Sequence, residues 1–258
     1  MRPALAFPFH DPAGRMFPHL QAILPDLKRH FEHAYLCPPV ATLKHLDHME
    51  QLQSNDFFTI FRVDRDLQIG ERFAHLYRHT AELAPQDQMV HLCFLDRLSF
   101  ALEGKYRDAF LADIDSLSAG DVPLIFQRSQ LAWETHPQNY REIEGIVTTV
   151  GRNLFGRELD YAWCHMVARA EQLHAIMPFV KNPDLSMVAE IIFYLQEKNL
   201  QTRAVDWLAW EDPFICGREA AGLKHERENS LAETHKRLGY ALPMTETLTR
   251  LSMNGKDQ

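Results

Sequence analysis

The chain has 258 residues, of which 46% are hydrophobic and 24% charged, and its 27 Lys and Arg against 35 Asp and Glu give a net charge of −8. This apolar content is sufficient for a buried core, so an intrinsically disordered or low-complexity protein is excluded. The acidic balance argues against a general nucleic-acid-binding surface, which neutralises phosphates with an excess of basic side chains. The composition therefore favours a globular protein of one or two domains.

In the first half of the chain, short apolar runs typical of strands alternate with stretches that have helical periodicity. Strands are expected at residues 3–9, 33–37, 57–63, 89–95 and 122–127, and helices at residues 16–31, 68–83 and 106–117. A sequence that alternates strands and helices in this way forms crossover units. We therefore expect an α/β fold with a mostly parallel central sheet flanked by helices.

The second half of the chain has a more helical character. Helices are expected at residues 140–154, 159–176, 184–198 and 220–235, with one short strand at residues 202–207. No stretch rich in Gly, Ser or Pro marks a firm boundary. We expect a single α/β domain at residues 1–219, with a helical C-terminal part, followed by a charged C-terminal helix and tail at residues 220–258.

The cysteines and the N-terminus indicate the compartment. Cys37, Cys93, Cys164 and Cys216 lie far apart without a C-x-x-C pair, so they do not indicate a disulfide framework. The N-terminal apolar run stops at His10 and is too short for a secretory signal, and the chain lacks the run of roughly 18 uncharged residues that a membrane span requires. We expect a cytoplasmic protein without a membrane span.

Polar side chains follow three of the expected strands, and ligands bind at the carboxyl ends of strands in open α/β sheets. These polar side chains are His10 and Asp11, Arg62 and Asp64, and Asp96 and Arg97. Each acid has helix capping or turn formation as an alternative role. The position of Asp96 predicts an oxygen ligand for a divalent cation that bridges phosphates, whereas Arg97 suits direct contact with a diphosphate.

Residues 207–213 (WLAWEDP) combine aromatic and acidic side chains. Aromatic faces stack on sugars or bases, and Glu211 or Asp212 is able to accept a proton from an attacking hydroxyl. An equally compatible interpretation is a pair of core tryptophans followed by an acidic turn that Pro213 ends.

The 14 histidines suggest a metal site as an alternative. His75, His79 and Glu82 share one face of an expected helix, which is a spacing that zinc ligands use. No H-E-x-x-H signature is present, so ordinary surface histidines are the favoured interpretation.

The order of these features resembles that of the nucleotide-diphosphosugar transferases of the GT-A fold, over residues 3–215. The resemblance rests on FPFHD at residues 7–11, RDLQIGER at 65–72, FLDRL at 94–98 and LFGRELDY at 154–161. It implies a Rossmann-like nucleotide-binding half, a nucleotide-sugar donor and a hydroxyl acceptor. The segment 94–98 corresponds to the acidic metal-binding motif of the family, but only the first of its two carboxylates is matched.

The resemblance implies a role for each candidate residue. Asp96 would face the diphosphate with or without Mg²⁺ or Mn²⁺, His225 would be a further metal ligand, and Glu211 or Asp212 would orient or deprotonate the acceptor. The residues expected to hold the nucleotide are His10, Asp11, Arg62, Asp64, Arg72, Arg97 and Arg128. The incomplete acidic motif favours a second hypothesis, a GT-A-like binding or scaffolding module without catalysis, and the histidine pairs leave a metal-dependent hydrolase as a third.

Overall fold

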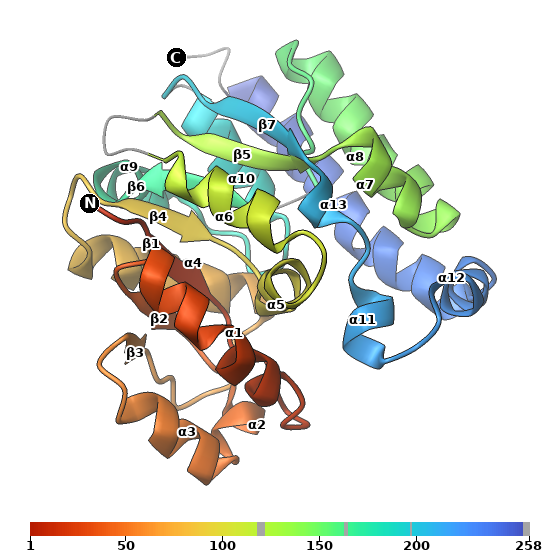
Figure 1. Ribbon diagram of the computed structural model, residues 1–258. Helices are drawn as coiled ribbons and strands as arrows, with labels where there is room; N and C mark the ends of the chain where they lie inside the picture. Colours follow the sequence, from red (N-terminus) through yellow and green to blue (C-terminus); the bar gives the residue numbers. More distant parts are fainter. Residues whose placement is uncertain (118–121, 163–164, 197, 255–258) are drawn as a thin grey trace.

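The computed structural model describes residues 1–117, 122–162, 165–196 and 198–254, and its middle layer is a seven-stranded sheet (Figure 1). The strands are β1 (Ala4–Phe7), β2 (Ala34–Leu36), β3 (Phe58–Ile60), β4 (Met89–Leu92), β5 (Leu124–Arg128), β6 (Met166–Arg169) and β7 (Gln201–Val205). Their order in the sheet is β3-β2-β1-β4-β6-β5-β7. Only β6 runs antiparallel to its two neighbours among the described strands. The expected α/β fold with a mostly parallel sheet is confirmed.

Helices cover both faces of this sheet (Figure 1). They are α1 (Met16–His30), α2 (Val40–Leu43), α3 (Leu46–Gln53), α4 (Ile69–Leu83), α5 (Leu95–Glu103), α6 (Arg107–Asp115), α7 (Gln130–Thr135), α8 (Gln138–Phe155), α9 (Ala170–Ile176), α10 (Met187–Gln196), α11 (Asp212–Cys216), α12 (Ala220–Glu228) and α13 (Leu231–Asn254). Two short 3₁₀ helices, η1 (Met177–Phe179) and η2 (Asp206–Leu208), complete the set of described helices.

The alternation of side chains along β1 divides the core into two halves. Ala4 and Ala6 face a cluster formed with α4, α8, α9, α10 and α13. Leu5 and Phe7 face a second cluster formed with α1, α3, α5 and α6. All four residues are fully buried, which explains why β1 is a continuous apolar run rather than an alternating one.

The direction in which the chain extends the sheet changes between β1 and β4. The chain proceeds outward from β1 through β2 to β3, and α4 then returns it to the other side of β1 as β4. The loops that follow β1 and β4 therefore leave neighbouring parallel strands in different directions. A crevice opens at such a reversal, outside the carboxyl ends of the strands.

Two segments differ from the sequence-based expectation. The helix expected at residues 159–176 is replaced by β6 and the shorter α9, because the buried MVAR run of β6 has no alternation and continues directly into a helical pattern. The helix expected at residues 220–235 consists of α12 and the start of α13. Helix α13 packs against α8 and α10, and it buries Ala241, Met244 and Leu248 in the core.

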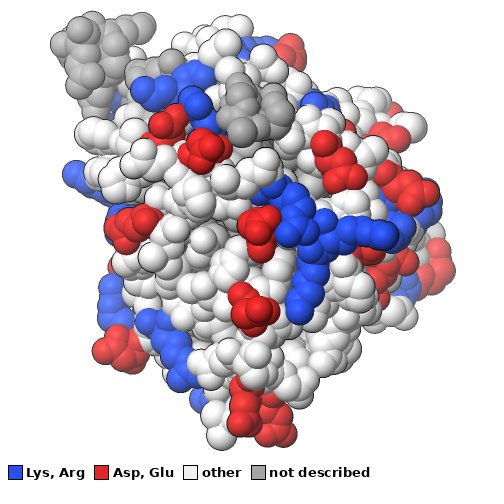
Figure 2. Space-filling view, turned by 60° about the vertical axis from the view of Figure 1, so that its left-hand side comes forward, with Lys and Arg blue, Asp and Glu red and all other residues white. Residues whose placement is uncertain are grey.

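The surface carries charged side chains of both signs. On the face shown in Figure 2, acidic and basic side chains are interspersed, apart from one group of adjacent basic side chains near the centre. That face therefore lacks a broad basic surface. Within the described ranges, no helix has the length and apolar character that crossing a bilayer requires.

Three histidines are buried in the interior. His91 on β4 and His165 beside β6 are fully buried, and their ring centroids lie 5.7 Å apart among aromatic side chains that include Trp207. His136 after α7 is 2% exposed. Burial disfavours the charged imidazolium, so the pKa of His91 falls to about 3 and the pKa values of His136 and His165 fall well below 6.5.

We predict that acid destabilises the protein through these histidines. Below pH 6.5 the unfolded chain binds protons that the folded chain excludes, so His91 lowers the free energy of unfolding by about 1.4 kcal/mol at pH 5.5, and His136 and His165 lower it further. Urea unfolding at pH 7.5 and 5.5 measures this loss. In His91→Leu the loss of unfolding free energy between pH 7.5 and 5.5 should be smaller by the contribution of one histidine. In His225→Gln, at a surface position, the loss should be unchanged. An equal pH dependence in wild type and His91→Leu would contradict the prediction.

Candidate functional site

A cleft with two lobes lies at the carboxyl ends of β1 and β4. Lobe 1 is a cavity of about 400 Å³ between the loop after β1, the start of α4, the loop after β4 and α11. Lobe 2 is a cavity of about 280 Å³ between the same β4 loop, residues 211–212 and one side of α13. Phe94 and Asp96 line both lobes, so the two cavities adjoin at the end of β4.

Lobe 1 contains a buried arginine, Arg72, without an ion-pair partner among the described carboxylates. Arg72 lies in the first turn of α4 and is 8% exposed; its Nη2 donates to the Leu67 carbonyl at 3.0 Å. Its Nε has no hydrogen-bond partner among the described residues, and no described carboxylate forms an ion pair with it. Arg15 is exposed at the edge of the same lobe. A buried guanidinium without an acidic partner is suited to bind an anion.

The position of Arg72 depends on a close backbone contact. Gly70 lies against residue Asp184, and a Cβ at Gly70 would be 2.0 Å from the Asp184 carbonyl oxygen. The amide of Gly70 donates to the Pro183 carbonyl at 2.9 Å. Only a residue without a side chain allows the start of α4 to approach this loop, so Gly70 determines where Arg72 enters the cleft.

His10 and Asp11, the predicted pair after β1, both line lobe 1, but their side chains have different roles. The carboxylate of Asp11 accepts hydrogen bonds from the amides of Arg15 and Phe17 at 2.7 and 2.9 Å, so it caps the start of α1. His10 is exposed, and partial burial together with the nearby Arg72 charge lowers its pKa. Asp11 therefore stabilises the wall of the lobe, and His10 presents a neutral ring to it.

Asp96 stands where the two lobes meet. It lies in the first turn of α5, and its Oδ1 accepts the Arg97 amide at 2.8 Å. Burial raises the pKa of Asp96, and the nearby Asp212 raises it further, while Arg97 opposes both effects. Asp96 is therefore close both to the basic lobe and to the predicted acidic pair.

The Arg97 side chain contacts the segment that contains Glu211. Its side chain is 4% exposed, its Nη1 donates to the Ala209 carbonyl at 2.6 Å, and it forms an ion pair with Glu211. From the other side, Thr135 Oγ1 accepts the Trp210 amide at 2.7 Å. These contacts hold residues 209–211 between α5 and α7.

Glu211 and Asp212 have different environments. Glu211 is buried against Arg97, and burial, together with Asp96 and Asp212, raises its pKa to about 8 although Arg97 acts in the opposite direction. Asp212 opens α11, and 31% of its side chain is exposed. Both residues line lobe 2, but Asp212 is the carboxylate that is accessible to a ligand.

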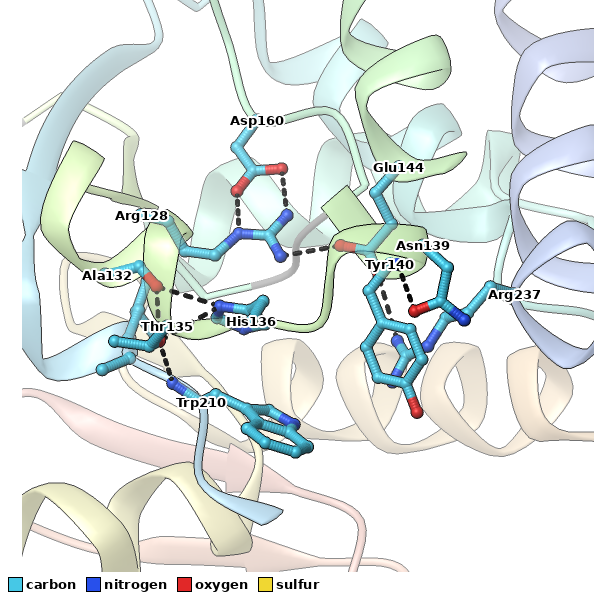
Figure 3. A network of polar contacts seen from close by, with 12 residues as sticks. Arg128, Ala132, Thr135, His136, Asn139, Tyr140, Glu144, Asp160, Trp210 and Arg237 are labelled. Carbon is cyan, nitrogen blue, oxygen red and sulfur yellow. Dashed lines mark hydrogen bonds and ion pairs between the residues drawn. The ribbon is translucent and has the colours of Figure 1, made fainter. Parts of the chain in front are cut away.

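Arg128 lies behind lobe 2 at the centre of a buried ionic network (Figure 3). Its guanidinium donates to Asp160 at 2.7 and 2.9 Å and to Glu144 at 2.7 Å, and it stacks 3.9 Å from the Trp133 ring centroid. The other Glu144 oxygen accepts Arg237 Nη1 at 2.9 Å. Glu144 and Arg237 line lobe 2, so Arg128 supports its wall instead of lining it.

Three predicted residues lie away from the cleft. Arg62 and Asp64 are exposed after β3 and line neither lobe. His225 is exposed on α12, where the Asn229 side chain contacts its ring, and it too lines neither lobe. These three side chains are therefore not assembled with Asp96.

The residues near Asp96 do not fit a divalent cation. In the part of the chain that is described, no group of three or more His, Cys, Asp or Glu is arranged to hold a metal ion. The neighbour of Asp96 is the fixed cation Arg97, which forms an ion pair with Glu211. The pair His79–Glu82 is a surface contact of 2.7 Å.

Sequence reasoning missed the contribution of α13 to lobe 2. Lys236, Arg237, Tyr240, Ala241 and Met244 all line this lobe. Their spacing of three and four residues is the signal that marks one face of a helix. Arg15 was also missed, although it follows directly after the predicted turn at residues 10–14.

Comparison with known proteins adds no relative. No protein-family model matches the sequence, and no curated protein matches it significantly.

We predict that Arg128 is essential for stability. Arg128→Met leaves Asp160 and Glu144 buried without their shared cation, which should lower the free energy of unfolding by about 3–5 kcal/mol. The control is Arg152→Met, which removes an exposed pair with Glu158 and should cost at most about 1 kcal/mol. Urea unfolding measures both variants, and equal losses would contradict the role of the buried network.

Proposed function

We propose that the protein transfers a sugar from a nucleotide-diphosphate donor to a hydroxyl acceptor. The observation that carries the proposal is the two-lobed cleft, in which an arginine without an acidic partner and an accessible carboxylate lie on opposite sides of Asp96. A group-transfer reaction needs two adjoining sites of this kind, because the leaving group and the acceptor must both lie next to the carbon atom that is transferred. The resemblance of residues 7–11, 65–72 and 94–98 to segments of GT-A transferases also favours the proposal, since these residues include much of the lining of lobe 1.

Lobe 1 is the proposed site of the donor diphosphate. The main electrostatic demand of the reaction is the negative charge that develops on the departing nucleoside diphosphate. Arg72 and Arg15 provide two basic side chains for this charge, and guanidinium groups bind phosphate oxygens in a bidentate manner. His10, at the opening of the lobe, is placed to contact the nucleoside.

Lobe 2 is the proposed acceptor site. Its apolar wall includes Phe94, Val188 and Met244, and its polar wall includes Asp212 and Lys236. A volume of about 280 Å³ accommodates a small hydroxyl compound or one end of a larger one. Asp212 is the proposed general base for the acceptor hydroxyl.

Glu211 has a different proposed role from that of Asp212. Its carboxylate is buried and paired with Arg97, so it is a positioning residue for the start of α11. The contact between Glu211 and Arg97 fixes the backbone from which Asp212 projects.

We predict that Arg72 determines nucleotide affinity. Arg72→Met removes charge-assisted hydrogen bonds, which are worth about 1.5–3 kcal/mol, so the dissociation constant of the preferred nucleoside diphosphate should rise about 10- to 100-fold. Arg78→Met is the matched control, since Arg78 is exposed on the same helix and lines neither lobe. Isothermal titration calorimetry with UDP, GDP, ADP, CDP and TDP measures the effect. Unchanged affinity in Arg72→Met would place the diphosphate elsewhere.

We predict that Asp212 is required for turnover and not for donor binding. Asp212→Asn keeps the shape of the side chain but removes the base, so kcat should fall about 10²- to 10⁴-fold while the donor dissociation constant stays the same. Asp108→Asn, at an exposed position of α6, is the control and should keep full activity. Full activity of Asp212→Asn would assign the base to another residue.

A binding module without catalysis is the second candidate function. The observation that favours it is the basic Arg97 beside Asp96, where the GT-A resemblance implies a second carboxylate. Asp96→Ala separates the two functions. A transferase should lose turnover in this variant, whereas a binding module should show no sugar transfer in the wild type and should keep its nucleotide in the variant.

A further inference from the structure

We infer that the cleft binds the nucleoside diphosphate without a divalent cation, because fixed guanidinium groups occupy the positions where a metal would act. This inference rests on the proposed transferase function and specifies which groups balance the negative charge of the diphosphate. Three features of the cleft support it, namely the anchoring of Arg97, the contacts of the nearby carboxylates and the unpaired Arg72 in lobe 1.

The first feature is that Arg97 is an immobile cation beside Asp96. Its guanidinium is held by the Ala209 carbonyl and by the Glu211 carboxylate, and its side chain is almost completely buried. Its amide is also bound to the Asp96 carboxylate. An arginine keeps its charge at any pH at which the protein is folded, so this charge cannot dissociate as a metal ion would.

The second feature is that the carboxylates near Asp96 already have cationic or main-chain partners. Asp96 accepts the Arg97 amide, Glu211 pairs with Arg97, and Asp212 Oδ2 lies 4.0 Å from Arg227. A divalent cation beside Asp96 would meet the repulsion of the buried Arg97 charge at short range. Only Asp96 and Asp212 would be available as protein ligands, so water and the diphosphate would have to supply the other oxygens around a Mg²⁺ ion.

The third feature is that lobe 1 contains a buried guanidinium that forms no ion pair with a described carboxylate. Arg72 is buried in the first turn of α4, and its Nε lacks a hydrogen-bond partner within the described ranges. Arg15 enters the same lobe from the start of α1. Two guanidinium groups oppose the charge of a diphosphate in the way that one divalent cation would.

The reaction balances without a metal. The bond between the anomeric carbon and the diphosphate oxygen breaks, and both of its electrons remain on that oxygen, where Arg72 and Arg15 stabilise them. The acceptor oxygen forms the new bond to the anomeric carbon and gives its proton to Asp212. The products are the glycosylated acceptor and the nucleoside diphosphate, and no oxidant or reductant takes part.

The test is calorimetric titration of the wild-type protein with the nucleoside diphosphates, once in MnCl₂ and once in EDTA. We expect dissociation constants that agree within about twofold, whereas a tightening of about tenfold or more by Mn²⁺ would overturn the inference and leave the proposed function intact. Absence of binding under both conditions would overturn both.

A second measurement uses Arg97→Gln and Arg97→Lys. Removal of the charge in Arg97→Gln leaves Glu211 without its cation, close to Asp96 and Asp212, so Mn²⁺ should raise the melting temperature of this variant and not that of the wild type or of Arg97→Lys. A rise of equal size in all three proteins would contradict the replacement of a metal by Arg97. If Arg97→Gln does not fold, the wild-type titration alone decides.

Discussion

The reversal of strand order between β1 and β4 is the constraint on which the cleft depends. Because β2 and β3 extend the sheet on one side of β1 and β4 to β7 lie on its other side, the loops after β1 and β4 separate and leave a crevice. All the proposed chemistry lies around it, with Arg15 and Arg72 on one side and Asp212 on the other. Helix α13 closes the far side of lobe 2 and thereby makes the C-terminal part of the chain a component of the site.

Burial of charge explains the different roles of the arginines. Arg128 is paired with Asp160 and Glu144 and supports the wall of lobe 2, and Arg97 is paired with Glu211, which holds its charge in place beside Asp96. Arg72 is also buried but has no acidic partner in the described part of the chain. Since an unpaired buried charge is unfavourable, Arg72 is the arginine that gains most from an anionic ligand.

The sequence predicted the sheet and much of the cleft because both follow from local patterns. Apolar runs located most strands, and polar residues at their ends located His10 and Asp96. The same rule failed for Arg62 and Asp64, because β3 is the edge strand and its carboxyl end lies two strands away from the reversal. Pairings between distant residues, such as that of Arg128 with Asp160, depend on the packed fold and leave no local signal. Strand β6 was missed for a related reason, since a four-residue strand with three consecutive buried residues has no periodicity of its own.

The proposed function requires that the crevice between β1 and β4 hold a nucleoside diphosphate with its phosphates against Arg72. Hydrogen–deuterium exchange measured by mass spectrometry, with and without each nucleoside diphosphate, locates the bound nucleotide. We expect slower exchange in residues 8–16, 69–73 and 94–97 with at least one nucleotide, and unchanged exchange in α12. Protection confined to another surface, or none with any of the nucleotides, would contradict it.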